Sequence, residues 1–305
     1  MKKALSVFLL AVLLLGLLPA LAPPARAISF ALVSANRTSA YVGDPVTWSV
    51  YNEIGSFLYY YSFTAYKDGI AYAASGFQGL RSFTIHPTSS GTYRTNIQIN
   101  DPAMPPNLLN ISGGDVTVTL RPAPKISKVE ALSGTSLKLA WNRISGATGY
   151  EVSRSTAKEG AYTLVKRTTA AALTDTGLKA GQRYYYKVRT YNYVAGFPPI
   201  PSGVFSSPAA GVPLGKPAIT GAVGASASSV KLAWGKVTGA TGYQILMGAT
   251  ASGVYKAVKS TTALSTTVGG LQPAKTYYFK VRAYKLIGTA RYYGPLSAYR
   301  AGRTK

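Results

Sequence analysis

An internal repeat at a spacing of 93 residues is the feature of this 305-residue chain that most constrains its fold. Segments 137–141 and 230–234 (LKLAW and VKLAW), 146–150 and 239–243 (both GATGY), and 184–189 and 277–282 (YYYKVR and YYFKVR) align without a gap. Shared composition does not give such a register. We therefore predict two copies of one domain, over residues 122–213 and 214–305, preceded by a different domain over residues 28–121.

Within each copy, apolar residues alternate at period two, as in Leu137, Leu139 and Trp141. These runs are short and are separated by Gly, Ser, Thr and Pro, which is typical of half-buried antiparallel strands. Helical periodicity appears nowhere after residue 27. The predicted fold is all-β, with three tandem antiparallel β-sandwich domains. We expect the linkers to be short and semi-rigid, because prolines mark the junctions: Pro122, Pro124, Pro213 and Pro217.

The first domain has the same rhythm in a different sequence. An aromatic strand over residues 59–66 ends at Lys67-Asp68-Gly69, which predicts a tight hairpin. We expect further strands at Val46, Trp48 and Val50, at Thr95, Ile97 and Ile99, and at Val116, Val118 and Leu120. Each domain then has one tryptophan on its second strand, and we expect all three in the cores: Trp48, Trp141 and Trp234.

The repeated domain resembles fibronectin type III modules. The matching residues are a strand B tryptophan (Trp141, Trp234), a strand C tyrosine (Tyr150, Tyr243), and a leucine six residues before a tyrosine (Leu178 and Tyr184, Leu271 and Tyr277). The resemblance implies that Tyr184 and Tyr277 form a tyrosine corner in the core. The Arg-Gly-Asp tripeptide is absent, so integrin binding gains no support. The first domain, with Gly-x-Tyr at Tyr93, resembles immunoglobulin-like (triple-tyrosine-like) repeats of bacterial surface proteins.

The first 27 residues have the form of a signal peptide. Lys2 and Lys3 precede an apolar run over residues 4–18, and Ala25-Arg26-Ala27 suits signal peptidase. The alternative is an uncleaved anchor helix, which the prolines at 19, 23 and 24 disfavour. We predict a secreted protein, free or held at the cell surface without a covalent anchor. A secreted chain without cysteine fits a bacterial exporter.

Positive charge increases towards the C-terminus. Five basic and five acidic residues balance over residues 28–121, twelve basic face four acidic over 122–213, and thirteen basic face none over 214–305. The formal net charge of +24 exceeds the roughly 2 to 8 that solubility requires. An anionic cell-envelope polymer or polysaccharide is therefore the predicted partner. Another secreted protein is the alternative, and no motif for specific nucleic acid recognition is present.

Candidate binding residues lie on the predicted strand that follows Leu178 in the first copy and Leu271 in the second. If Tyr184, Tyr186 and Val188 point inward, the residues between them point outward. The predicted exposed ladder is aromatic, basic, basic, aromatic, twice over: Tyr185, Lys187, Arg189 and Tyr191, then Tyr278, Lys280, Arg282 and Tyr284. Such a ladder could stack on sugars and pair with acidic groups. The alternative is that these side chains suit a solvated strand and discourage its pairing with other chains.

Catalytic residue types are scarce. The chain has one histidine, His86, no cysteine, no Gly-x-Ser-x-Gly elbow, and nine carboxylates that occur singly. We therefore expect no enzyme, no cofactor and no metal. Asp101 and Asp115 could lie close enough to bind calcium, but no Asp-x-Asp spacing supports a calcium site.

The predicted function is a non-enzymatic exported binding or adhesion protein, whose basic C-terminal domains hold an anionic polymer. Two alternatives stay open. The chain is an inert spacer or a component of a protein assembly, or it is an accessory carbohydrate-binding protein of a polysaccharide-degrading system.

Overall fold

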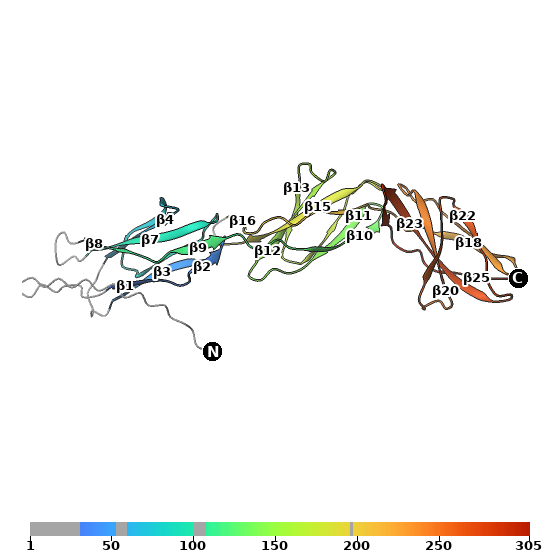
Figure 1. Ribbon diagram of the computed structural model, residues 1–305, viewed down its shortest axis with the longest axis horizontal. Helices are drawn as coiled ribbons and strands as arrows, with labels where there is room; N and C mark the ends of the chain where they lie inside the picture. The colour runs from blue at the N-terminus through green and yellow to red at the C-terminus, as the bar shows by residue number, and fades with distance from the viewer. Residues whose placement is uncertain (1–30, 53–59, 101–107, 196–197) are drawn as a thin grey trace, which may run out of the picture.

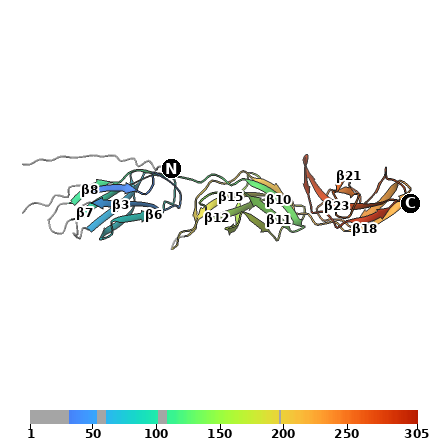
Figure 2. The same ribbon diagram turned by 90° about the horizontal axis from the view of Figure 1, so that it is seen from below.

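The computed structural model describes residues 31–52, 60–100, 108–195 and 198–305, and every regular element in these ranges is a β-strand. The strands form six sheets, which pair into three units that follow one another along the long axis (Figures 1 and 2). We call these units the N-terminal, middle and C-terminal sandwiches. The all-β fold of separate antiparallel sheets is as predicted. The segment expected to be a signal peptide (residues 1–27), Tyr59 and Asp101 lie outside the described residues.

The N-terminal sandwich has a three-stranded and a six-stranded sheet. The first has the order β1 (Ala31–Ala35), β3 (Val46–Asn52), β6 (Ser82–Ile85). The second has the order β2 (Ser39–Tyr41), β9 (Val116–Thr119), β7 (Gly91–Asn100), β4 (Tyr60–Lys67), β5 (Ile70–Gln78), with β8 (Leu108–Ser112) beside β7.

Two details of this sandwich bear on the sequence-based expectations. Asp68 (φ 49°) and Gly69 (φ 83°) form the predicted hairpin between β4 and β5, since both residues of such a turn need positive φ. The chain crosses from one sheet to the other before β3, where the short β2 pairs in parallel with β9. Trp48 therefore lies on the third strand, and its expected place on the second strand was wrong.

The middle and C-terminal sandwiches repeat one strand order. In the middle sandwich, one sheet is β10 (Ile126–Ser133), β11 (Ser136–Trp141), β14 (Ala172–Asp175), and the other is β13 (Thr163–Thr168), β12 (Gly149–Ser155), β15 (Tyr184–Asn192), with β16 (Ile200–Pro201) and β17 (Ala209–Gly211) both on β15. In the C-terminal sandwich, the sheets are β18 (Ile219–Ser226), β19 (Ser229–Trp234), β22 (Ser265–Val268), and β21 (Lys256–Thr261), β20 (Gly242–Gly248), β23 (Thr276–Ile287), with β24 (Ala290–Tyr293) and β25 (Arg300–Arg303) both on β23.

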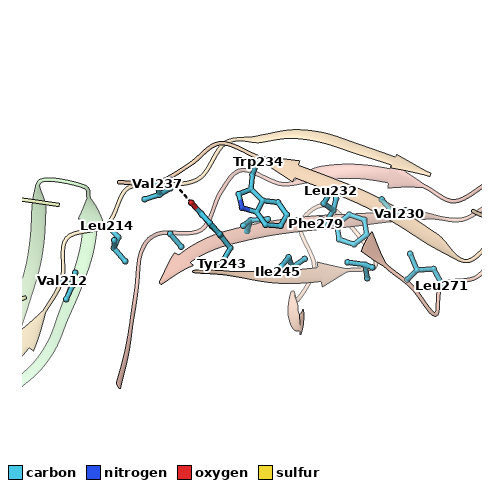
Figure 3. Packing of buried hydrophobic residues seen from close by; sticks show 13 residues of the cluster. Val212, Leu214, Val230, Leu232, Trp234, Val237, Tyr243, Ile245, Leu271 and Phe279 are labelled. Carbon is cyan, nitrogen blue, oxygen red and sulfur yellow. Dashed lines mark hydrogen bonds between the residues drawn. The ribbon is translucent and has the colours of Figure 1, made fainter. Parts of the chain in front are cut away.

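Each core is built around a tryptophan. Trp48, Trp141 and Trp234 are all buried. In the two repeats the indole packs against the strand C tyrosine, with ring centroids 5.5 Å apart for Trp234 and Tyr243. The Tyr243 hydroxyl accepts a hydrogen bond from the Val237 amide at 2.9 Å, which fixes the loop before β20 (Figure 3).

Tyrosine hydroxyls also fasten the loops before the long central strands. The hydroxyls of Tyr184 and Tyr277 accept hydrogen bonds from the amides of Lys179 (3.1 Å) and Gln272 (3.0 Å). These amides directly follow Leu178 and Leu271 in the sequence. This is the geometry that a tyrosine corner requires. Tyr184 is buried and Tyr277 half-buried. In the N-terminal sandwich the buried Tyr93 donates to the Ser89 carbonyl at 3.0 Å.

The middle sandwich has a polar network in its core that the C-terminal sandwich lacks. In the middle sandwich, Asp175 accepts a hydrogen bond from the Tyr186 hydroxyl at 2.7 Å and pairs with Arg154 at 2.8 Å. A shift of 93 residues replaces all three groups by apolar ones: Met247, Val268 and Phe279. The polar network is therefore a local feature of one repeat that the fold itself does not require.

Stability of the middle sandwich should fall in alkaline solution because of Tyr186. Burial, followed by the hydrogen bond to Asp175, raises the pKa of Tyr186 far above its ordinary value near 10. The unfolded chain ionises this phenol above about pH 10 while the folded chain does not, so the stabilisation is complete below that pH and is lost as pH rises. We expect Tyr186→Phe to remove up to about 1.4 kcal/mol per pH unit from the slope above pH 10. Urea unfolding of both chains between pH 9 and 11 measures it, and equal slopes would contradict the assignment.

Candidate polymer-binding face

The predicted ladder lies on the central strands β15 and β23, but it is not a row of free side chains. Lys187, Arg189, Lys280 and Arg282 are half-buried, as are Tyr191 and Tyr278. Tyr185 and Tyr284 are buried, at 9% and 7% exposure, so the expectation that they are exposed was wrong.

Neighbouring residues explain why these outward-facing tyrosines are poorly exposed. Tyr191 and Tyr284 lie directly across from Gly149 and Gly242 on the adjacent strand. Their rings fill the space above these glycines, which leaves no room for a side chain there. The ring of Tyr185 is covered by the Arg183 guanidinium, whose central carbon is 5.0 Å from the ring centroid. Outward-facing tyrosines thus seal the outer surface of each sheet.

Each of the four cations makes a cation–π contact with an aromatic ring from a neighbouring strand or loop. Lys187 lies 4.4 Å from the centroid of Tyr162, and Lys280 lies 4.3 Å from that of Tyr255, the equivalent residue of the repeat. Burial raises the pKa of both tyrosines, so both rings are neutral at physiological pH. Arg189 lies over Phe205 at 4.5 Å, and Arg282 over Tyr293 at 3.8 Å. Each cation is oriented before any ligand arrives.

The middle and C-terminal sandwiches differ in the group that pairs with the arginine of the central strand. In the middle sandwich, the buried Glu151 accepts from Arg189 Nε at 2.7 Å and from Arg167 Nε at 2.8 Å, so one carboxylate serves two guanidinium groups. The position equivalent to Glu151 is Gln244, whose Oε1 accepts from Arg282 Nε at 2.8 Å and Nη2 at 2.6 Å. An amide orients the guanidinium as a carboxylate does but leaves its charge uncompensated.

A second arginine stands beside Arg282. The hairpin between β23 and β24 brings Arg291 over Tyr284, with 4.9 Å between its guanidinium carbon and the ring centroid. Tyr284 in turn meets the edge of Tyr293 at 6.1 Å. Arg282, Tyr293, Tyr284 and Arg291 thus form one stack, which we call the arginine–tyrosine stack. Arg291 makes no ion pair with any described residue.

The arginine–tyrosine stack borders an open groove of about 590 Å³ at the junction of the middle and C-terminal sandwiches. Strand β10 supplies one wall, including the ion pair of Lys128 with Glu130 at 2.6 Å, and β24 supplies the other. The sequence did not single out Arg291, because the hairpin that carries it lies beyond the aligned repeat. Its motif Arg291-Tyr292-Tyr293 repeats the mixture of basic and aromatic residues found on β23, which is the one signal that could have identified it.

Groups that could hold a metal or perform catalysis are sparse. No three His, Cys, Asp or Glu side chains cluster anywhere in the described ranges. His86 lies with Nδ1 3.4 Å from the Gly43 carbonyl. Asp115 pairs with Arg94 at 2.6 Å and so is engaged by a cation of the chain itself. Among the described residues no helix has the length and hydropathy needed to cross a bilayer.

Comparison with known proteins finds similarity to segments of large enzymes. The chain is 35% identical over 184 residues to exoglucanase B of Cellulomonas fimi, covering 53% of this chain and 15% of that protein. It is 37% identical over 87 residues to a poly(3-hydroxybutyrate) depolymerase of Ralstonia pickettii, covering 28% and 17%. It is 32% identical over 126 residues to an amylopullulanase of Thermoanaerobacterium saccharolyticum, covering 40% and 9%. The chain thus spans less than a fifth of each relative's length. The activities in the relatives' names are properties of those proteins.

No family model matches the chain. Among solved structures, the chicken CNTN1 FN1–FN3 domains align over 90% of this chain and 98% of that one, at 18% identity and a TM-score of 0.31. This neighbour consists of fibronectin type III domains. A TM-score that low carries no argument about function.

Proposed function

We propose that this chain is an exported, non-catalytic binding protein whose basic C-terminal sandwich holds an anionic polymer of the cell envelope or extracellular space. The observation that carries the proposal is the exchange of Glu151 for Gln244 between the repeats. It leaves Arg282 oriented on Tyr293 without a carboxylate partner, and the neighbouring Arg291 packs on Tyr284 without an ion pair to any described residue. Guanidinium edges suit the carboxylates, sulfates or phosphates of such polymers.

We assign the middle and C-terminal sandwiches to the fibronectin type III class and the N-terminal sandwich to the immunoglobulin-like class. The shared strand order of the two repeats and their tyrosine corners support the first assignment. The crossing of the chain from β1 to β2 between two packed sheets supports the second. Export rests on the expected signal peptide over residues 1–27.

Replacing Arg282 and Arg291 together by glutamine should weaken retention on an anionic polymer by about tenfold or more at low salt, because two charge-assisted contacts are lost. The measurement is co-sedimentation of the purified chain with cell envelopes across a salt series. Screening and counterion release predict that wild-type retention falls steeply as salt rises.

The matched control for this experiment is Lys231→Gln/Lys236→Gln. Both lysines are exposed and lie outside β23 and β24, and their loss changes the net charge equally. We expect the control to keep most of the retention. If it loses as much as the arginine variant, net charge alone explains binding and the arginine–tyrosine stack is not the site.

A second candidate function is accessory carbohydrate binding in a polymer-degrading system. The similarity to segments of an exoglucanase and an amylopullulanase favours it. It predicts retention on insoluble neutral polysaccharides that persists at high salt, whereas the first proposal predicts salt-sensitive retention on envelopes alone.

A further inference from the structure

Hydroxyls and amides line the outer face of β2, β4, β7, β8 and β9 in the six-stranded sheet of the N-terminal sandwich. Along β4 and β7, buried apolar residues alternate with outward-facing polar ones. The strand register aligns the outward residues in four rows across the sheet. These rows are Ser62–Gln98–Asn110, Thr64–Asn96–Ser112, Tyr66–Arg94, and Ser39–Thr117–Thr92. We call this surface the polar face.

One end of the polar face is hollowed into an open cleft of about 470 Å³. Tyr66 and Asn96 line it beside two fixed carboxylates. Asp115 accepts from Arg94 Nε at 2.6 Å and Nη2 at 2.9 Å. Asp68 accepts from the Thr92 amide at 2.8 Å and from Lys67 at 2.9 Å.

Those partners hold the pKa of both carboxyls below their ordinary range. The Arg94 hydrogen bond lowers it for Asp115, and the Thr92 amide, followed by Lys67, lowers it for Asp68. Both groups are therefore acceptors at neutral pH, and each negative charge has a positive neighbour. The polar face offers many donors and acceptors in fixed positions without net charge.

The chemistry of the polar face selects among ligand classes. A polyanion needs unpaired cations, and the cations here are already paired. A protein partner docking on this sheet would need a broad apolar patch, whereas the rows on β2, β4, β7, β8 and β9 contain Tyr66 as their one aromatic residue. Apolar positions continue the rows only on the edge strand β5, at Ala71, Ala74 and Phe77. Chains of sugars present hydroxyls that both donate and accept, at repeated spacing, and their apolar ring faces stack on tyrosine.

We propose that the polar face is a binding site for an uncharged polysaccharide chain, with Asn96 and Gln98 as central hydrogen-bonding residues and Tyr66 and Arg94 beside the cleft. The site is separate from the arginine–tyrosine stack and does not rest on the anionic-polymer proposal. It gives the chain two polymer sites of opposite character, one on the N-terminal sandwich and one where the C-terminal sandwich meets the middle one (Figure 1).

The test is co-sedimentation of the purified chain with cellulose, starch granules and curdlan in 1 M NaCl, where screening suppresses the basic sandwich. We expect retention on at least one of the three. Asn96→Ala/Gln98→Ala should raise the half-saturating concentration by about tenfold, since two hydrogen-bonding amides are removed from an exposed surface. Both side chains are exposed, so the sandwich should keep its melting temperature.

The matched control is Ser34→Ala/Ser82→Ala, which removes two exposed hydroxyls from the other sheet of the same sandwich. It should bind as the wild type does, and so should Arg282→Gln/Arg291→Gln in 1 M NaCl. Absence of retention on all three polysaccharides overturns the proposal. So does equal retention by the wild type and the amide variant, whatever the envelope experiment shows.

Discussion

Replacing Asp175 by alanine should destabilise the middle sandwich by about 3 kcal/mol. The carboxylate is buried and holds both the Tyr186 hydroxyl and the Arg154 guanidinium. Removing one member of a buried pair typically costs about 3 to 5 kcal/mol, because the remaining polar groups lose their partner. The Arg154 side chain is 31% exposed and can reach water, so we expect the lower end of that range.

The repeat itself supplies the compensating variant. Arg154→Met, Asp175→Val and Tyr186→Phe together install the residues that the C-terminal sandwich has at these positions. Replacement of a whole buried ionic network by packed apolar groups is often neutral or stabilising. We therefore expect the triple variant to be at least as stable as the wild type, although it contains a change at Asp175.

Hydrogen exchange of peptides from β12 and β15 in the intact chain measures the stability of this sandwich separately from the others. Exchange in Asp175→Ala should be faster than in the wild type, and the triple variant should restore protection. If the triple variant is as unprotected as the single one, the polar network contributes to the fold in a way that its apolar counterpart does not match.

The sequence predicted the strands better than it predicted their surfaces. Alternation at period two and the 93-residue register identify which residues of β15 and β23 face the core, because alternation is local. Burial of Tyr185 and Tyr284 depends on their neighbours in the folded sheet. Gly242 lies across from Tyr284 and leaves space for its ring, whereas the Arg183 guanidinium covers the ring of Tyr185. Cross-strand register is set by the fold as a whole.

The distribution of charge could likewise be predicted from the sequence only in part. Counting residues located the excess positive charge in the last domain, and the pairing pattern refined it. Lys187 and Arg189 have the same sequence signal as Lys280 and Arg282, yet Arg189 pairs with the Glu151 carboxylate whereas Arg282 meets only the neutral amide of Gln244. The two residues lie on the strand next to the cations, about forty positions away, so no local motif connects them.

The junction between the N-terminal and middle sandwiches was predicted only as a proline-marked linker, and the structure shows a buried ionic contact there. Arg121, 3% exposed, pairs with Asp44 and donates to the Ser145 carbonyl at 2.8 Å. Asn192 of β15 donates to the Asp44 carboxylate at 3.1 Å, and Ile200 of β16 packs into the N-terminal core. Contacts of this kind couple the orientations of the two sandwiches.

Asp44→Ala should therefore free the N-terminal sandwich to reorient. The change leaves Arg121 buried without its carboxylate, an imbalance of about 3 kcal/mol that the chain relieves by opening the junction to water. Because the chain has no cysteine, spin labels can be attached at Thr117→Cys and Lys158→Cys, both exposed. Pulsed electron paramagnetic resonance should give a narrow distance distribution for the wild type and a broad one for Asp44→Ala.

Asp115→Ala is the matched control for this measurement, because it removes an exposed ion pair from the same sandwich and should leave the distribution narrow. A distribution in Asp44→Ala as narrow as in the wild type would show that Ile200 and the backbone hydrogen bonds of Arg121 with Ser202 and Val204 hold the junction without the ion pair. Broadening confined to Asp44→Ala would show that the ion pair fixes the orientation of the N-terminal sandwich, and so of the polar face, relative to the middle sandwich.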